Sequence, residues 1–273
     1  MLAHEFPVEL LCGLLACPRS SYYYQEASED VWVRDAIEQI AAAFPRYGYR
    51  RITAQLARRG LQVNHKRVLR IMGEESLLVA VKRYARPIYK RHDLPRYPNL
   101  IRNVTLAYAD QVWGSDFTYI RLRQEWVYLA VILDLFTRSI RGWHLGRDRT
   151  EHLVTTALSK ALASHTAPAI HHSDQGVQYC AAGYVTRLQQ AGVAVSMSAA
   201  GCPTENAFVE RVIRTLKEEE VSLNDYADFA DAEQRIGQFL DDVYNTKRVH
   251  SALGDRTPAE YEAIMRSQQP DGS

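Results

Sequence analysis

The chain has 273 residues, a formal net charge of +1, and a composition of 47% hydrophobic and 24% charged residues. This mixture is typical of a globular protein and excludes disordered and collagen-like chains. The four cysteines form no CxxC pair and the histidines lack metal-ligand spacing, so neither a disulfide framework nor a zinc site is predicted. No apolar stretch approaches the roughly 20 residues that span a bilayer, and we expect a cytoplasmic protein associated with the nucleoid.

The small net charge conceals an uneven distribution along the chain. Residues 45–104 contain 15 lysines and arginines against three acids, a net charge of +12, whereas the remaining 18 basic and 29 acidic residues give −11. A segment this basic is typical of a surface that binds nucleic-acid phosphates. A solvated basic face would have the same composition, so charge alone leaves both interpretations open.

The N-terminal part of the sequence is expected to be helical. Residues 7–25 predict a helix, a turn and a second short helix, and residues 30–44 predict an amphipathic helix. Another helix is expected within residues 47–60, ended by Gly60. Asn64 then caps a helix whose inward-facing residues are predicted to be Val68, Leu69 and Met72.

The last two of these helices are joined by a tight turn that contains glycine. This pattern is typical of a helix-turn-helix motif, although an ordinary helical hairpin would look similar. The helices carry basic residues predicted to contact DNA, namely Arg50, Arg51, Lys66, Arg67 and Arg70. We therefore expect a DNA-binding helical region over residues 1–78, followed over 79–105 by a basic linker that contains three prolines.

From residue 106 the pattern changes to that of an α/β domain. Short breaks separate three β-rich stretches and predict an antiparallel meander, formed by residues 111–122, 125–138 and 139–146. Further helices are expected at 150–165, 181–191, 204–220 and 228–245, and further strands at 169–174 and 193–198. This order predicts a mixed five-stranded sheet flanked by helices, with a core over residues 106–223 and a C-terminal helix and tail over 224–273.

Two aspartates occupy positions where α/β proteins place ligand sites. Asp116 lies inside the first predicted strand, where a carboxylate is costly unless it is paired or binds a metal. Asp174 follows the fourth strand, directly before a loop that contains glycine, at a sheet edge where ligands commonly bind. Taken singly, each residue is as compatible with a structural role as with catalysis.

A third acidic residue, Glu210, belongs to the polar face of the predicted helix 204–220. At about 100° per residue, Glu210 and Lys217 fall on one stripe, and the opposite face is apolar and expected to pack on the sheet. A salt bridge from Glu210 to Arg214 one turn later is the alternative interpretation.

The strings around these residues are VWGSDFTYI, HHSDQGVQY, SMSAAGCPTENAFVERVIRTLKEE and YNTKRVHSALGDRTPAEYE. Together and in this order they resemble the DDE transposases of bacterial insertion sequences, specifically the second-frame (OrfB) product of the insertion-sequence-three family. The resemblance runs from about Pro7 to Tyr261 and implies an RNase H-like catalytic core shared with retroviral integrases. The family usually has Asp-Asn where this chain has Glu205 and Asn206. It usually has Glu-Ser-Phe-Phe where this chain has Glu210 followed by Arg-Val-Ile. Both departures leave the three carboxylates intact.

The resemblance implies that Asp116, Asp174 and Glu210 are catalytic and hold two Mg²⁺ ions, with Mn²⁺ as a substitute and Asp116 shared between the ions. Water would attack a phosphodiester at the element end, and the released 3′-OH would attack a second phosphodiester and join the strands. Lys217 and Asn206 are expected to contact DNA phosphates. The implied partners are double-stranded DNA at the element ends and target, further copies of this chain, and the first-frame (OrfA) product.

Three alternatives stay open at this point: a non-catalytic DNA-binding regulator, a partial transposase subunit that needs a first-frame partner, and a nuclease that cuts DNA without joining it. A non-catalytic DNA-binding regulator would not need the three acids, and a nuclease that cuts without joining would have less need of a separate DNA-binding region. Side chains expected to be structural or packed are Asp134, His171, His172, Trp113 and Trp126, whereas His250 fits a substrate contact and a packing role equally well.

Overall fold

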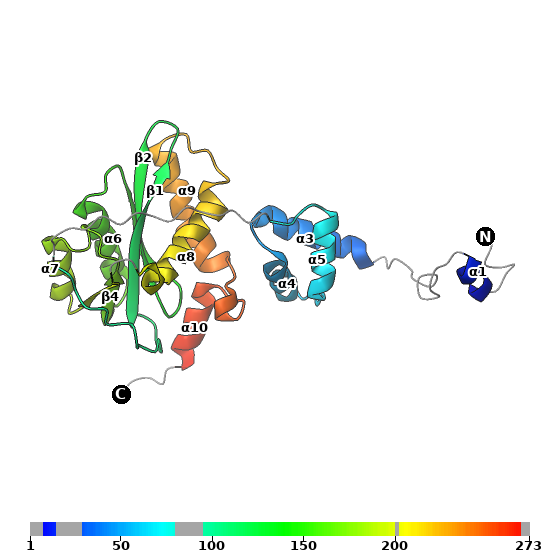
Figure 1. Ribbon diagram of the computed structural model, residues 1–273, viewed down its shortest axis with the longest axis horizontal. Helices are drawn as coiled ribbons and strands as arrows, with labels where there is room; N and C mark the ends of the chain where they lie inside the picture. The colour runs from blue at the N-terminus through cyan, green and yellow to red at the C-terminus, as the bar shows by residue number, and fades with distance from the viewer. Residues whose placement is uncertain (1–7, 15–28, 80–94, 200–201, 269–273) are drawn as a thin grey trace.

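The computed structural model describes residues 8–14, 29–79, 95–199 and 202–268. Figure 1 shows a helical unit beside a larger domain built around a sheet, with a separate short helix, α1 (Val8–Leu14), near the N-terminus. The second short helix expected within residues 7–25, and most of the predicted linker, lie outside the described residues. Within the described part of the chain, no helix combines the length and the apolar character needed to cross a membrane.

Three helices form the helical unit: α3 (Glu29–Ala43), α4 (Tyr49–Arg58) and α5 (His65–Glu74). The capping prediction is confirmed, because the Asn64 side chain accepts a hydrogen bond from the Lys66 amide at 2.9 Å. Gly60 follows α4 with a φ of +82°, the left-handed conformation that glycine adopts at low cost. The prediction that Leu69 points inward is wrong: Leu69 is 40% exposed, and Ile71 is buried in its place beside Val68.

The predicted sheet is confirmed. Its five strands run in the order β3-β2-β1-β4-β5 and are β1 (Val112–Arg121), β2 (Trp126–Asp134), β3 (Ile140–Gly146), β4 (Ile170–Ser173) and β5 (Ala194–Met197). β1, β2 and β3 form the antiparallel meander. β4 pairs with β1 in parallel, and β5 pairs with β4 in parallel. The central position of β1 brings its residues next to the end of β4, where parallel strands place ligand sites.

Helices cover both faces of the sheet (Figure 1). α6 (Glu151–Ser164) and α7 (Ala182–Gln190) pack on one face, and α8 (Ala207–Leu216) and α9 (Phe229–Gln238) pack on the other. Alternate residues of β1 therefore serve two separate cores, with Trp113 in one and Val112 in the other. The prediction that Trp126 is a core residue is wrong, because its ring is 47% exposed at the start of β2.

The two long helices predicted in the C-terminal half each change their helical form. The first begins as a 3-10 turn (Pro203–Asn206), continues as α8, and ends in a π-helical segment (Lys217–Val221). The second consists of α9 and a π-helical segment (Phe239–Lys247). A further helix, α10 (Pro258–Gln268), lies in the part predicted only as a tail.

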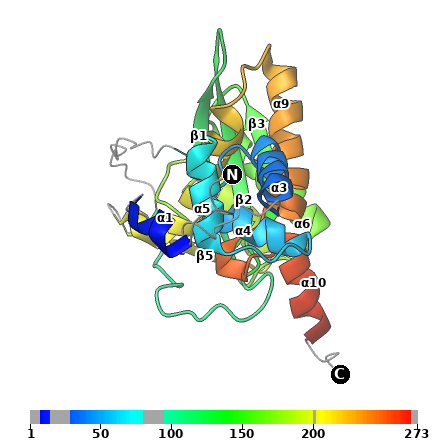
Figure 2. The same cartoon turned by 90° about the vertical axis from the view of Figure 1, so that its right-hand side faces the viewer.

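The helical unit, which lies in front of the domain in Figure 2, contacts the C-terminal part of the domain. Glu219 accepts hydrogen bonds from Arg51 at 3.0 Å and from Arg248 at 2.7 Å. The hydroxyl of Tyr47 accepts a hydrogen bond from the amide of Val249 at 3.0 Å, and Val249 packs in the core of the helical unit. Ion pairs and apolar packing thus join segments about 200 residues apart in the sequence.

Candidate active site

Asp116 occupies the middle of β1, on the side of the sheet that α8 covers. Its Oδ1 accepts a hydrogen bond from the amide of Phe117 at 2.8 Å. Burial and the negative charge of Asp174, with a smaller effect of Glu210, raise the pKa of the Asp116 carboxyl well above its usual range. The charges of Asp174 and Glu210 therefore both act on the Asp116 carboxyl.

Asp174 reaches Asp116 through the strand register. Ser115 of β1 is paired with Ser173 of β4, and Asp116 and Asp174 are the residues that follow in two parallel strands. Just past the strand, Asp174 Oδ1 accepts a hydrogen bond from the amide of Gly176 at 2.9 Å, an Asx-type turn that holds the carboxylate in place. Because β4 ends at Ser173, Asp174 lies at the start of the loop that follows the strand, next to Asp116 of β1.

Glu210 is brought to this place by the close packing of α8 on β1. Gly114 makes that approach possible, since a Cβ atom there would lie 2.7 Å from Cγ2 of Val209. The side-chain amide of Asn206 donates a hydrogen bond to the carbonyl oxygen of Ser115 at 3.1 Å, which fixes the start of α8 beside Asp116. Burial and the charge of Asp174 raise the pKa of Glu210, while Arg214 opposes this effect.

The carboxylates converge without forming a finished metal-ligand shell. Over the ranges that the structure describes, no three His, Cys, Asp or Glu side chains are placed to hold a metal ion as they stand. The set nevertheless fits hard divalent cations, because its donors are carboxylate oxygens whose mutual repulsion such cations relieve.

Lys217 follows the last turn of α8 and lies close to Asp116. Burial lowers the pKa of its amine, and the charge of Asp116 acts in the opposite direction. Its Nζ lies 4.7 Å from the centre of the Tyr119 ring. The charges of Lys217 and Glu210 thus both act on Asp116.

Asn206 and Arg51 differ from their predicted role as DNA contacts. Asn206 is 5% exposed and uses its amide within the domain. The Arg51 side chain is 22% exposed and is engaged by Glu219. Each of the two side chains bonds to a partner in a different element and so holds two elements together. Sequence spacing alone does not reveal these partners.

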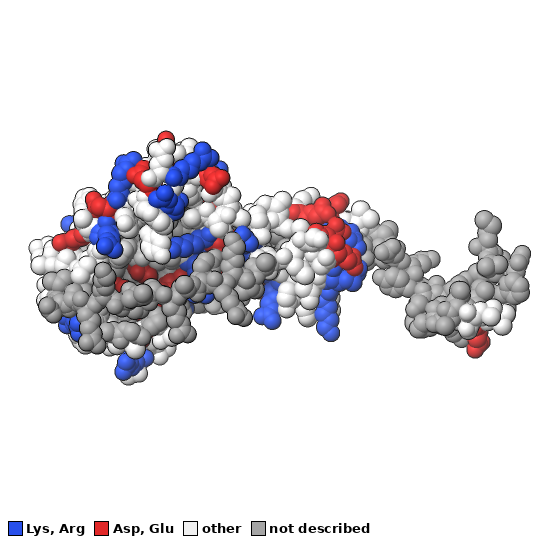
Figure 3. Space-filling view, turned by 45° about the horizontal axis from the view of Figure 1, so that its top comes forward, with Lys and Arg blue, Asp and Glu red and all other residues white. Residues whose placement is uncertain are grey.

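The other predicted DNA contacts belong to the surface of the helical unit. Arg50, Lys66 and Arg70 are exposed, and Arg67 is half-buried. Arg70 pairs with Glu74 at 2.7 Å, and Glu74 also pairs with Arg34. Figure 3 shows acidic side chains gathered on one side of this unit and basic side chains projecting from the opposite side. One face is thus suited to a polyanion and the other is not.

The histidines near the carboxylates are packed, as predicted. Burial lowers the pKa of His171 to about 3, and its Nε2 lies 2.9 Å from the Tyr184 hydroxyl. His172 is buried, its Nδ1 lies 2.8 Å from Ser196 Oγ, and its pKa is lowered to about 4. His250 packs on the ring of Tyr244 with centres 4.9 Å apart, which favours the packing interpretation.

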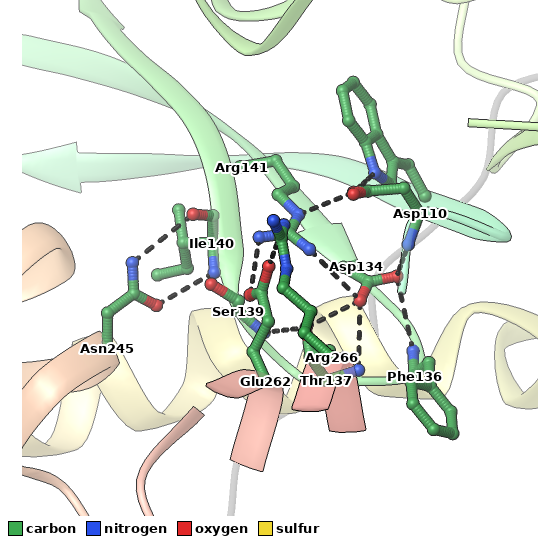
Figure 4. A network of polar contacts seen from close by, with 11 residues as sticks. Asp110, Asp134, Phe136, Thr137, Ser139, Ile140, Arg141, Asn245, Glu262 and Arg266 are labelled. Carbon is green, nitrogen blue, oxygen red and sulfur yellow. Dashed lines mark hydrogen bonds and ion pairs between the residues drawn. The ribbon is translucent and has the colours of Figure 1, made fainter. Parts of the chain in front are cut away.

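Asp134 and Trp113 are buried, as expected for structural residues, and Asp134 belongs to a buried ionic network shown in Figure 4. Arg141 lies at its centre and pairs with Asp110 at 2.8 Å, with Asp134 at 3.5 Å and with Glu262 of α10 at 2.7 Å. Trp113 Nε1 donates to Asp110 at 2.8 Å. Sequence reasoning missed this network because its members are spread over strands, loops and α10.

Family models agree with the two-part organisation. Residues 29–86 match an HTH-like domain, and residues 108–203 and 191–258 match two models of the integrase core domain. A cryo-EM structure of the simian T-cell lymphotropic virus intasome with a PP2A regulatory subunit is similar with a TM-score of 0.52 and 16% identity, covering 87% of this chain and 76% of that chain. This likeness shows a shared fold.

Two curated relatives extend the similarity to nearly the whole chain. The transposase for insertion sequence element IS904 of Lactococcus lactis is 38% identical over 234 residues, which cover 82% of this chain and 92% of the relative. The transposase InsF for IS3A of Escherichia coli K12 is 32% identical over 272 residues, covering 94% of each. The protein is therefore a polynucleotidyl transferase of the DDE type with an integrase core and a DNA-binding HTH-like domain. It belongs to the transposases of the IS3-family insertion sequences.

Proposed function

We propose that Asp116, Asp174 and Glu210 are the catalytic residues with which this transposase cuts and joins DNA strands. The observation that carries the proposal is that three carboxylates come from adjoining elements, namely β1, the end of β4 and α8. Asp116 and Asp174 follow the paired residues Ser115 and Ser173, and Asn206 at the start of α8 donates a hydrogen bond to Ser115. The charges of Asp174 and Glu210 both raise the pKa of Asp116. Structural acids are normally paired with cations, and a cluster of like charges is costly unless a function requires it.

The same three residues would hold divalent metal, and we propose Mg²⁺, with Mn²⁺ as a substitute and two ions per site. When bound, such ions neutralise the carboxylates and stabilise the charge that develops on the oxygens of an in-line displacement at phosphorus. Asp116 has the central position, because β1 lies between the end of β4, which is followed by Asp174, and α8, which carries Glu210. We therefore propose that Asp116 would contribute to holding both ions.

The reaction proceeds in two displacements at phosphorus. Water attacks a phosphodiester at the element end, breaks the P–O3′ bond and leaves a free 3′-OH. That hydroxyl attacks a target phosphodiester, a new P–O bond forms, and the target's own 3′-oxygen leaves as a hydroxyl. Lys217 holds a DNA phosphate near Asp116 as a point charge. Asn206 acts indirectly, because its bond to Ser115 sets the position of α8.

We further propose that the exposed basic side of the helical unit binds the element end. Arg50 and Lys66 supply exposed charge for contacts with the DNA backbone, half-buried Arg67 adds to it, and Arg70 would contribute on leaving its ion pair with Glu74. Two DNA ends must meet for strand transfer, so we expect a symmetric assembly of this chain, aided by a first-frame product. Because its substrate is DNA, we propose that the protein acts at the nucleoid.

Strand cleavage and joining on labelled linear DNA with a candidate element end test the proposal. The wild-type chain is expected to give nicked and joined products with Mg²⁺ or Mn²⁺, and Glu210→Gln is expected to bind DNA without forming either. Glu233→Gln makes the same change on α9 and is the matched control, expected to retain wild-type products. Binding without chemistry in wild type, even with the first-frame product added, would favour a regulator.

A further inference from the structure

Two aromatic side chains are exposed at the far end of the β1–β2 pair. Tyr119 of β1 is 59% exposed and Trp126 of β2 is 47% exposed. Their ring centres are 5.4 Å apart in an edge-to-face arrangement. Large rings that are held in place and left open to solvent usually mark a surface with a binding partner.

Two cations frame the aromatic pair. The Nζ of Lys217 lies 4.7 Å from the centre of the Tyr119 ring, and the Cζ of Arg121 lies 5.2 Å from the centre of the Trp126 ring. No carboxylate in the described part of the chain forms an ion pair with either cation. The positive charge of Arg121 is therefore available to a negatively charged partner, and that of Lys217 is shared with the nearby charge of Asp116. Two cations beside the rings favour nucleic acid over an apolar protein segment.

The pair lies farther along β1 than the carboxylate cluster and on the opposite face of the sheet. Tyr119 is three residues beyond Asp116 on the same strand, which at ~3.3 Å per residue is a separation of roughly 10 Å along the strand, and this odd spacing turns the two side chains to opposite faces. Lys217 connects the two places, since it lies over Tyr119 and its pKa responds to Asp116. β4 pairs with β1 only as far as Ser115, so the edge of β1 beyond Asp116 is not covered by that strand.

We propose that Tyr119 and Trp126 form a stacking platform for an unpaired DNA base next to the phosphodiester that is cut, with Lys217 and Arg121 binding the adjacent phosphates. Aromatic faces combined with cations are the usual way in which proteins hold single-stranded nucleic acid. Bases inside a duplex have both faces covered, so the platform selects an end that has opened. The proposal rests on the proposed function, because it takes its ligand from the DNA that this site cuts.

Fluorescence of 2-aminopurine tests the platform without any chemistry. The probe is a short duplex with 2-aminopurine as the first unpaired base of a 3′ overhang, compared with the same base paired in a blunt duplex, in EDTA. The full-length wild-type chain is expected to quench the unpaired base and to bind the overhang more tightly than the blunt end. Tyr119→Ala is expected to lose the quenching and about 5- to 150-fold in affinity for the overhang.

Two variants sharpen the result. Tyr119→Phe keeps the ring and is expected to retain quenching, which separates stacking from a role of the hydroxyl. Tyr108→Ala removes another exposed tyrosine, one that lies before the start of β1, and is expected to behave like wild type. Wild-type quenching and overhang affinity in Tyr119→Ala would overturn the proposal.

Cleavage of paired and pre-opened ends separates this proposal from the proposed function. Tyr119→Ala is expected to cut a pre-opened end faster than a paired one, since opening is the step that the platform assists. If wild type cuts DNA and Tyr119→Ala matches it on both ends, the platform is refuted and the proposed function stands. If wild type cuts neither end, the proposed function fails, whatever the fluorescence shows.

Discussion

Replacing Gly114 with alanine tests whether the approach of α8 to β1 sets the active site. The added Cβ would lie 2.7 Å from Cγ2 of Val209 and 2.8 Å from Cδ2 of Leu135. Carbon atoms pack at about 3.5–4.0 Å, so α8 must move away by about 1 Å. Overpacking of this kind costs about 1–3 kcal/mol of the free energy of unfolding, equivalent to a fall of about 2–12 °C in melting temperature.

Glu210 follows Val209 directly and moves with it. A displacement of about 1 Å at a catalytic group can lower the rate about 10²-fold, and we expect a loss of this order for Gly114→Ala. Single-turnover strand cleavage measures the rate, and circular dichroism measures the melting temperature. Val209→Ala in the same chain removes the methyl group nearest the new Cβ, so the double variant is expected to recover part of the rate.

Gly73→Ala provides the control for the change itself. Its Cβ would meet nothing closer than Leu78 Cδ1 at 3.9 Å, and alanine is favoured over glycine in a helix. Stability and cleavage rate are expected to stay the same or rise. A Gly114→Ala chain that melts and cuts like wild type would refute the claim that this contact positions Glu210.

Three further predictions concern the surrounding structure. Arg141→Ala leaves buried carboxylates without their cation and is expected to cost about 3–5 kcal/mol in urea unfolding, whereas Arg147→Ala, at a 63% exposed side chain, is expected to cost less than about 1 kcal/mol. Burial lowers the pKa of His250 to about 3 in the folded chain, whereas the same group in the unfolded chain takes up a proton near pH 6.5. Lowering the pH from 7 to 5 therefore favours the unfolded chain, and we expect the resulting loss of stability to be about 2 kcal/mol smaller in His250→Gln than in wild type. An equal loss in the two chains would contradict the assignment. In DNA-binding titrations, Lys66→Ala is expected to lower the slope of log K against log salt by about 1, and Arg51→Ala is expected to leave the slope unchanged while lowering the melting temperature.

Much of the fold follows from periodicity in the sequence. β1 alternates between its two faces and β2 is almost continuously apolar, so both were predictable, and the order of elements then defines the sheet. The carboxylates could be found because each stands out locally: Asp116 inside an apolar strand, Asp174 after one, and Glu210 on the polar face of an amphipathic helix. Their convergence follows from the topology.

The features that could not be predicted depend on contacts between distant segments. Arg51 has the basic surroundings of a DNA contact, but its partner Glu219 is 168 residues away. Two ion pairs hold α10, from Glu260 to Arg58 and from Glu262 to Arg141, so the helix needs no strong apolar stripe. The π-helical ends of the C-terminal helices likewise depart from the regular spacing on which the prediction rested.

The central claim, that the three carboxylates act as one site, is tested most directly by the additivity of their loss. Single-turnover cleavage rates with Mn²⁺ would be measured for Asp174→Asn, for Glu210→Gln and for the double variant, at DNA concentrations that saturate binding. When residues act as a unit, replacing one of them lowers the rate as much as replacing both. We predict equal losses in all three chains; a double variant whose loss is the product of two partial single losses would contradict a shared site.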